Sequence, residues 1–370
     1  MSTYGVVFGG PSPEHDISIL TGLQASHALV ENGHDVEAIY WSKTGAFFSV
    51  DPALEAQAYV QGIPPKALAL ELNASPGGGF SSEGRMGRRR SLDLAAVVNC
   101  CHGGPGEDGT LQAALDLAGI HYTGPSAPGA ALGMDKLAFS AVVQLAGLPT
   151  LPKALLTPTD DELSELGFEG PWIIKPRFGG SSIGIQVTDD LPSAKALLRT
   201  SPHLRQGAVI EPFLSDAIDL NIGVRTWPEV QLSPIERPLN KEPGRIYSYA
   251  EKYLGGEGLS SAPRELPAEV PAVTADALRE DARAVIDLVG VRGLARIDFL
   301  WHEGEIYVNE INTIPGALGW YLWVEPRVTF AALLADLLEE AIKSPTNLYS
   351  TQGADGSALR AAGGIASKLA

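Results

Sequence analysis

Cysteine is almost absent from the sequence, which contains two among 370 residues, the adjacent Cys100 and Cys101. Neighbouring residues seldom satisfy disulfide geometry, and two thiols without further soft ligands do not form a metal site. A disulfide-stapled scaffold and a zinc module are therefore excluded. We interpret the pair as two small buried residues at the end of a strand.

Long apolar runs are also missing. No stretch approaches the roughly 18 uncharged apolar residues of a membrane span, and the N-terminus lacks the basic and apolar regions of a signal peptide. We therefore expect a cytoplasmic protein. Positive charge is scarce as well, since 27 Lys and Arg against 44 Asp and Glu give a net charge of −17. This balance argues against a broad nucleic-acid-binding surface.

What is present fits a globular chain of two or three domains, with 45% hydrophobic and 19% charged residues. Residues 1–125 alternate strands and helices, as a parallel α/β domain does. Apolar runs predict strands at 4–8, 36–41 and 94–100, and helical spacing predicts helices at 17–30 and 111–118. The stretch 73–90 is rich in turn formers and ends in the basic run RMGRRR, so we predict a mobile loop.

The pattern changes after residue 125 to hairpins, which predicts an α+β arrangement. We expect a central subdomain at 126–219, a C-terminal subdomain at 220–349 and a disordered tail at 350–370. The predicted helices are 130–146, 193–199, 274–289 and 330–343, and the predicted strands are 172–175, 183–188, 208–211, 294–301 and 305–312.

The two commonest phosphate loops, G-x-x-x-x-G-K-[ST] and G-x-G-x-x-G after the first strand, do not occur. Instead, an apolar strand ends in Lys175 and turns through a Gly-Gly-Ser-Ser tip at 179–182. Backbone N–H groups and hydroxyls at such a tip can surround phosphoryl oxygens, and the lysine supplies a point charge. An ordinary hairpin with a flexible tip explains the glycines equally well.

A second constellation lies on the two strands near the C-terminus, which carry Arg296, Asp298, Glu310 and Asn312. Strand side chains alternate faces, so Asp298 opposite Glu310 would bring three oxygen donors together, with a three-residue loop at 303–305. The alternative is a charged solvent face. Like charges directly opposite one another destabilise a sheet, and a cation would resolve the conflict. We therefore predict a Mg²⁺ site.

Together these segments resemble the D-alanine:D-alanine ligases of the ATP-grasp superfamily, over most of residues 1–345. The resemblance also rests on ordered segments elsewhere: GGPSPEHDIS at 9–18, HGGPGEDGTLQ at 102–112, YTGP at 122–125, MDK at 134–136, YAEKY at 249–253 and NTIPG at 312–316. It implies an ATP-grasp fold preceded by an N-terminal α/β domain. It also implies a homodimer that makes a dipeptide from ATP and amino acids through an acyl phosphate.

The resemblance also implies roles for individual residues. ATP would be bound by Lys136, Lys175, Ser182, Glu211, Phe213, Leu214, Asp219 and Lys252, and two Mg²⁺ ions, or Mn²⁺ in their place, by Asp298, Glu310 and Asn312. Glu14, Ser181, Arg296 and Tyr253 would be catalytic, with Ser181 and Tyr253 in a hydrogen-bonded link to Glu14. Glu14, His102, Arg296, Gly316 and Tyr321 would bind the amino acids, and Lys252 and Tyr253 would lie on a loop that closes over the site.

One position departs from the family pattern. Tyr321 stands where a serine that binds the acceptor carboxylate is expected, and a phenol is bulkier and carries its hydroxyl further from the backbone. This difference predicts a different acceptor, or a structural role for Tyr321 beside inward-packed Trp320 and Trp323. The leading hypothesis is a D-alanine:D-alanine ligase. The alternatives are a specialised dipeptide ligase, a non-catalytic nucleotide-binding protein and a nucleotide-dependent reductase.

Overall fold

The computed structural model describes residues 2–84, 89–156, 166–239, 262–346, 350–362 and 364. Its N-terminal part is a seven-stranded sheet with the strand order β6-β5-β4-β3-β2-β1-β7. The strands are β1 Thr3–Gly9, β2 Asp35–Trp41, β3 Phe47–Val50, β4 Leu68–Asn73, β5 Gly79–Glu83, β6 Arg89–Ser91 and β7 Ala96–Asn99. Strand β1 pairs in parallel with β2 and with β7, so the three strands predicted from the apolar runs are confirmed.

Two features of this sheet differ from the prediction. Strands β2 to β6 are antiparallel neighbours, so the sheet is mixed and not wholly parallel. The predicted mobile loop at 73–90 is also wrong, because β5 and β6 extend the sheet there. Phe80 of β5 is 1% exposed and meets the Phe47 ring edge-on, with 5.3 Å between centroids. Strands this short carry too few residues for periodicity, and their pairing in the sheet stabilises them.

Helices cover both faces of the parallel strands. Val6 and Phe8 of β1 pack in one cluster with α1 (His15–Glu31), whereas Val7 packs in another cluster with α2 (Thr110–Ala118). Side chains alternate along a strand, so a strand buried on both faces needs a continuous apolar run. Cys100 and Cys101 are fully buried free thiols directly after β7, as the sequence predicts.

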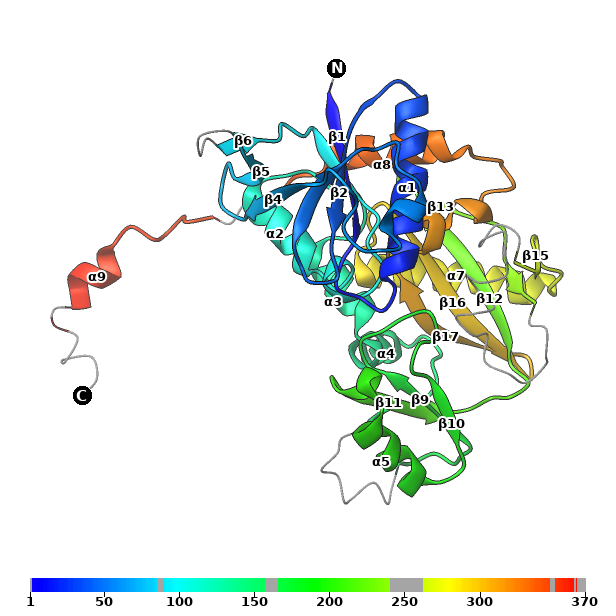
Figure 1. Cartoon of the computed structure of the whole chain (residues 1–370). Helices are drawn as coiled ribbons and strands as arrows, with labels where there is room; N and C mark the ends of the chain where they lie inside the picture. The colour runs from blue at the N-terminus through cyan, green and yellow to red at the C-terminus, as the bar shows by residue number, and fades with distance from the viewer. Residues whose placement is uncertain are drawn as a thin grey trace.

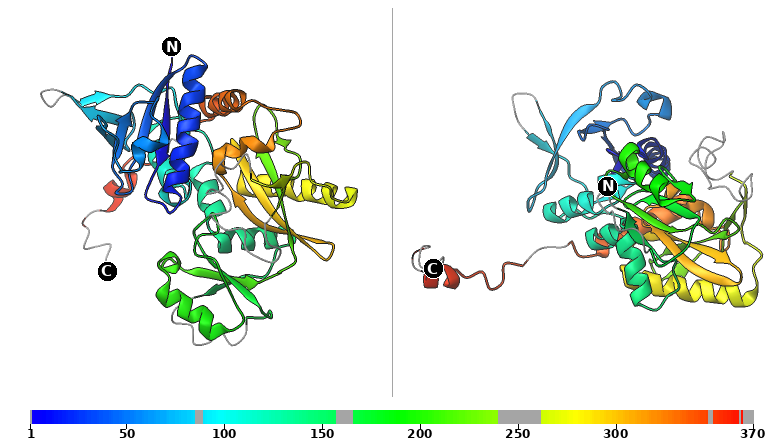
Figure 2. Two further views of the ribbon diagram at one scale, coloured as in Figure 1. Left: turned by 45° about the vertical axis from the view of Figure 1, so that its right-hand side comes forward. Right: turned by 90° about the horizontal axis from the view of Figure 1, so that it is seen from below.

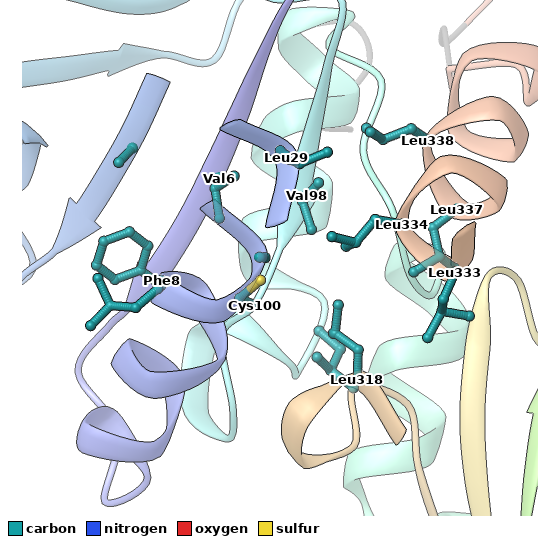
Figure 3. Close-up of a cluster of buried hydrophobic side chains, with 14 of the residues drawn as sticks. Val6, Phe8, Leu29, Val98, Cys100, Leu318, Leu333, Leu334, Leu337 and Leu338 are labelled. Carbon is teal, nitrogen blue, oxygen red and sulfur yellow. The ribbon is translucent and has the colours of Figure 1, made fainter. Parts of the chain in front are cut away.

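The last long helix, α8 (Phe330–Lys343), returns to this N-terminal sheet. Its leucines share a core with α1 and with strands β1 and β7 (Figure 3). The members that Figure 3 labels are Val6, Phe8, Leu29, Val98, Cys100, Leu318, Leu333, Leu334, Leu337 and Leu338. Leu318 comes from the segment that follows the C-terminal strands, so this core attaches that segment to the N-terminal part of the molecule.

The central part forms a separate lobe built on a four-stranded sheet in the order β10-β9-β11-β8 (Figures 1 and 2). Its strands are β8 Ala154–Leu156, β9 Trp172–Pro176, β10 Gln186–Thr188 and β11 Ala208–Pro212, covered by α5 (Leu191–Thr200). Strands β9 and β10 are antiparallel and flank the Gly/Ser tip, so the predicted hairpin is confirmed.

The predicted helix at 130–146 is two helices, α3 (Ala127–Met134) and α4 (Lys136–Leu145). Asp135 separates them in an extended conformation, with φ −84° and ψ 96°. Its carboxylate accepts hydrogen bonds from the backbone N–H groups of Leu137 and Ala138, and the Arg177 side chain also binds it. An aspartate that caps a new helix in this way offers the backbone an alternative to continuing the old one.

The third part is a four-stranded sheet in the order β13-β12-β16-β17, packed against α7 (Ala272–Val289) and α4. Its strands are β12 Ile218–Arg225, β13 Gln231–Leu232, β16 Leu294–His302 and β17 Glu305–Asn312, and beside it β14 (Arg237–Pro238) pairs with β15 (Arg264–Glu265). The short helical turns are η1 Ala56–Tyr59, η3 Gly104–Gly106, η4 Pro202–Leu204 and η6 Gly316–Leu322.

The register of β16 and β17 decides which side chains share a face. Asp298 lies opposite Glu310 and Arg296 lies opposite Asn312, as the sequence predicts. A bulge next to Asp298 then shifts the register, so His302 pairs with Glu305 and the loop has two residues and not three. A bulge inserts an extra residue in one strand, which here is Asn309.

The tail contains one short helix, α9 (Ser357–Ala362), which buries none of its residues. It extends away from the body of the molecule (Figures 1 and 2). Among the residues that the structure describes, no helix is both long and apolar enough to cross a membrane.

Candidate active site

Every predicted site residue that the structure describes lines one cavity of about 240 Å³, between the β9–β11 sheet, the β16–β17 sheet and loops of the N-terminal part. They are Glu14, His102, Lys136, Lys175, Ser181, Ser182, Glu211, Phe213, Leu214, Asp219, Arg296, Asp298, Glu310, Asn312, Gly316 and Tyr321. The remaining two, Lys252 and Tyr253, lie outside the described residues. Residues up to 307 positions apart in the sequence therefore meet at one site, since Glu14 and Tyr321 both line it.

A buried cluster of charges forms the end of the cavity beside β9 and β11. The carboxylate of Glu211 pairs with Lys175 on one oxygen and with Lys153 on the other, the latter at 2.9 Å. All three side chains are at most 9% exposed. Burial alone would raise the pKa of Glu211, but the two ammonium groups outweigh it and hold the pKa at about 2. Glu211 is therefore ionised at neutral pH.

Burial lowers the pKa of Lys153 more than Glu211 raises it, whereas the pKa of Lys175 is raised overall because Glu211 and Glu310 outweigh its burial. Lys175 therefore keeps its charge, and its ammonium also donates to Asn309 Oδ1 at 3.2 Å. Sequence reasoning missed Lys153 and Asn309. Nothing local marks either residue, because one precedes the short strand β8 and the other is the extra residue of the bulge.

The Gly/Ser tip lines the cavity and contacts two other elements. The Lys136 ammonium donates to Gly179 O and to Glu310 Oε2, both at 2.8 Å. The Ser181 hydroxyl donates to Glu14 Oε1, a link that the family resemblance implies. Ser181 and Ser182 both lie in the left-handed region, with φ of 52° and 58°. Such strain in non-glycine residues persists where surrounding contacts hold it, and it concentrates at functional sites.

Glu14 reaches the cavity from the N-terminus of α1, where the helix dipole favours a carboxylate. Backbone surrounds it closely. A Cβ atom at Gly103 or Gly180 would lie 2.5 Å or 2.8 Å from Glu14 Oε2, and Gly103 also has a positive φ of 62°. The positive φ disfavours any other residue at Gly103, whereas a side chain at Gly180 would displace the carboxylate end of Glu14; Glu14 is only 8% exposed.

The oxygen donors of β16 and β17 lie at the centre of the site. Arg296 binds Asp298 through a two-pronged pair of hydrogen bonds, at 2.6 Å and 2.7 Å, and Asn312 Nδ2 donates to Asp298 Oδ2 at 2.9 Å. Lys136 pairs with Glu310. These cations balance two carboxylates that would otherwise repel one another across the strands. Two carboxylates and an amide oxygen are hard donors of the kind that Mg²⁺ accepts.

Within the described residues, no three His, Cys, Asp or Glu side chains cluster in a way that could hold a metal ion. The predicted donor set fits that result, because its third member is an amide. A cation bound by few protein ligands takes its others from water and phosphate oxygens, as Mg²⁺ does in phosphoryl-transfer sites. The residues present therefore fit Mg²⁺ held together with a nucleotide.

Tyr321 forms the wall of the cavity next to Arg296. Its hydroxyl accepts a hydrogen bond from Arg296 Nη1 at 3.3 Å, and the Arg264 guanidinium lies over its ring at 4.3 Å from the centroid. Trp320 and Trp323 turn away from the cavity. Trp320 Nε1 donates to Val328 O at 2.8 Å, and Trp323 is 3% exposed. The two tryptophans are thus structural, and Tyr321 alone of the three lines the cavity.

The sequence matches two family models that together span most of the chain. The model for the D-ala D-ala ligase N-terminus matches residues 3–125, and the model for the D-ala D-ala ligase C-terminus matches residues 142–339. The chain belongs to the D-alanine–D-alanine ligase family. The predicted membership and the predicted ATP-grasp fold are therefore confirmed.

Known members of this ligase family resemble the chain along most of its length. The D-alanine–D-alanine ligase of Campylobacter lari is 31% identical over 86% of this chain and 89% of its own. That of Mycobacterium ulcerans is 32% identical, with coverage of 91% and 94%. The crystal structure of the Helicobacter pylori ligase is 25% identical, covers 93% of this chain and 100% of its own, and superposes with a TM-score of 0.73.

Another buried carboxylate, Glu107, was missed although it lies inside the quoted segment 102–112. It lines the cavity and accepts hydrogen bonds from the backbone N–H groups of Gly103 and Ile314, at 2.8 Å and 3.0 Å. Burial and the nearby Glu14 raise its pKa to about 7. Its place in a segment that carries the family resemblance could have drawn attention to Glu107. A glutamate beside an aspartate in a loop, however, gives no indication of burial.

Proposed function

We propose that this family member is an ATP-dependent carboxylate:amine ligase that joins two amino acids through an acyl phosphate, with D-alanine as the donor. The observation that supports it most directly is the position of the oxygen donors of β16 and β17 in the same cavity as Lys175 and the Gly/Ser tip. A non-catalytic nucleotide-binding protein would not need this donor set. A reductase would need the dinucleotide fingerprint, which the sequence lacks.

In this proposal the lysines bind the phosphates of ATP. Lys136 and Lys175 point into the cavity from α4 and β9, and the Gly/Ser tip covers the same space. Asp298, Glu310 and Asn312 would hold Mg²⁺, or Mn²⁺ in its place, and the ions would neutralise charge on the phosphoryl group in transfer. The adenine would lie along the end of β11, at Glu211, Phe213 and Leu214. The backbone there is held in place by the hydrogen bond from Phe213 N to Pro171 O at 2.8 Å. Asp219 would bind the ribose.

The amino acids would occupy the other end of the cavity. Glu14, oriented by Ser181, would bind the donor ammonium, because a carboxylate held in a fixed orientation forms strong hydrogen bonds with a cation. Arg296 would stabilise negative charge on the acyl phosphate and on the tetrahedral intermediate. His102, Gly316 and Tyr321 line this end, and the predicted closing loop with Lys252 and Tyr253 would exclude water that hydrolyses acyl phosphates.

Phosphate release tests the proposal. The unsubstituted protein should release phosphate from ATP only with Mg²⁺ and a pair of amino acids, and Asp298→Asn or Glu310→Gln should lower the rate at least 100-fold. Asp276→Asn is the matched control, because Asp276 lies exposed on α7 outside the cavity. If both cavity variants released phosphate at the unsubstituted rate, the metal assignment would be wrong.

D-alanine is our first proposal for the acceptor, and Tyr321 is the reason to test others. A panel of D-alanine, D-serine, glycine, larger D-amino acids and D-lactate, each offered with D-alanine as donor, would identify the acceptor from the products. Formation of D-alanyl-D-alanine would mean that the phenol is accommodated. We also propose a cytoplasmic homodimer, and light scattering of the purified protein tests the oligomeric state.

A further inference from the structure

The backbone of Ile314 is held at both of its polar atoms by side chains from one loop of the N-terminal part. His102 Nδ1 lies 2.7 Å from Ile314 O, and Ile314 N donates to Glu107 Oε1 at 3.0 Å. Both side chains are buried, with exposed fractions of 3% and 8%. Ile314 lies two residues after Asn312, the last of the proposed metal ligands, so this contact fixes the chain where it leaves the metal site.

The hydrogen bonds of His102 determine where its proton lies. A carbonyl oxygen can only accept, so Nδ1 must carry the proton that bonds to Ile314 O. Burial lowers the pKa of His102 to about 4, so the ring is neutral and its Nε2 can only accept. The donor to Nε2 is the Thr21 hydroxyl at 2.8 Å. The Thr21 oxygen in turn accepts from Ala317 N at 3.3 Å.

The segment held in this way has an unfavourable backbone. Ala317 and Leu318 lie in the left-handed region, with φ of 49° and 51°. A non-glycine residue is strained in this region, so contacts from outside the segment must hold the turn. The same turn carries Gly316 and leads to Tyr321, which line the amino-acid end of the cavity.

We propose that Thr21, His102 and Glu107 are positioning residues that hold the turn after Asn312 in the shape that the amino-acid end of the site requires. The inference rests on the proposed ligase function for its kinetic consequence. All three residues act through backbone atoms of the turn. We expect ATP binding to be little affected, because Lys175, Glu211 and the Gly/Ser tip belong to the central lobe and not to this turn.

Thr21 offers the sharpest test, because two substitutions separate its hydroxyl from its shape. Thr21→Val keeps the volume and removes the hydrogen bonds to His102 and Ala317, whereas Thr21→Ser keeps the hydroxyl. We expect Thr21→Val to raise the KM for the amino acids about tenfold and to leave the KM for ATP unchanged. Thr21→Ser should have the same KM for the amino acids as the unsubstituted protein. Thr226→Val is the matched control, since that hydroxyl bonds to Gly293 O and Glu340 Oε1 away from the cavity. It should leave both KM values unchanged.

Hydrogen exchange supplies a readout that does not need activity. In Thr21→Val the amides of residues 313–322 should exchange at least tenfold faster, while those of β9 and β11 keep their rates. Thr226→Val should not change exchange at 313–322. Unchanged exchange there in Thr21→Val would overturn the proposal, as would equal rises in the KM values for ATP and amino acids. An inactive unsubstituted protein would refute the ligase function, and the exchange result would still decide the positioning role.

Discussion

Replacing Glu211 by glutamine removes the carboxylate that two buried lysines share. The side chain is 1% exposed, and its two oxygens each pair with a different ammonium group, of Lys153 and of Lys175. Glutamine has nearly the same size and shape, so packing hardly changes. The substitution therefore tests charge alone. The two buried ammonium groups of Lys153 and Lys175 would remain without the carboxylate that lies between them.

The magnitude follows from the pKa of Glu211. A pKa held at about 2, against an ordinary value of 4.5, corresponds to about 3 kcal/mol of stabilisation of the folded state at neutral pH, at about 1.4 kcal/mol per pH unit. Removing one partner of a buried ion pair costs about 3–5 kcal/mol in other proteins, which agrees. We therefore expect Glu211→Gln to lower the free energy of unfolding by about 3 kcal/mol at pH 7.

Urea unfolding followed by tryptophan fluorescence measures this change as a midpoint lowered by about 1 M. A depressed carboxyl pKa stabilises the fold above the unfolded value and loses that effect as the pH falls through the folded value. The difference between the two proteins should therefore shrink between about pH 4.5 and pH 2.

Glu71→Gln is the control, because Glu71 pairs with Arg89 at the surface, where both side chains are more than 60% exposed. It should cost less than about 1 kcal/mol. If Glu211→Gln were no more costly than this control, or if its effect did not vary with pH, the buried charge cluster would not contribute as argued.

Three further predictions concern the cavity. Tyr321→Phe keeps the ring under Arg264 but removes the hydroxyl beside Arg296, so steady-state kinetics should show about a tenfold higher KM for the acceptor at an unchanged KM for ATP; an unaltered acceptor KM would exclude contact with the hydroxyl. Glu107→Gln removes a carboxyl whose pKa is raised to about 7. The unsubstituted protein should become about 3 kcal/mol less stable as the pH rises from about 4.5 to 7, and this decrease should be absent from the variant when both are unfolded in urea at a series of pH values. Parallel pH profiles for the two proteins would contradict this. Lys136→Met removes the ammonium that joins Gly179 O to Glu310 and should weaken ATP binding at least tenfold by calorimetry; equal affinity would show that Lys136 does not bind phosphate.

The candidate site was largely predictable because its residues lie at recognisable points of local patterns. Lys175 ends an apolar strand before a Gly/Ser tip, and Asp298 and Glu310 lie on two strands that a short loop joins. The alternation of side chains along a strand is a local property, so it allowed the pairing of these two carboxylates to be predicted. These carboxylates line one cavity with Glu14, which accepts the hydrogen bond from Ser181 that the family resemblance implies.

Other features had no local signal. The Arg177 side chain that binds the Asp135 carboxylate is 42 residues away, and the bulge at Asn309 lies where that side chain meets Lys175, 134 residues away. Strands β5 and β6 are too short to show a period, and their stability comes from the sheet that they extend. The pairing of Lys153 with Glu211 depends on the register of β8 against β11.

The amino-acid sequence by itself determined the hairpin with its Gly/Ser tip and the pairing of Asp298 with Glu310, because both depend on side-chain period and turn chemistry within a few neighbouring residues. The ATP-grasp fold followed from the family resemblance of longer segments. The tertiary structure alone decided which distant groups meet: Lys153 with Glu211 inside the central lobe, and His102 and Glu107 with the backbone of Ile314 across two parts of the molecule. It also placed the Tyr321 hydroxyl beside Arg296. Such contacts depend on the register and packing of elements between 25 and 212 residues apart, and no local pattern encodes those distances.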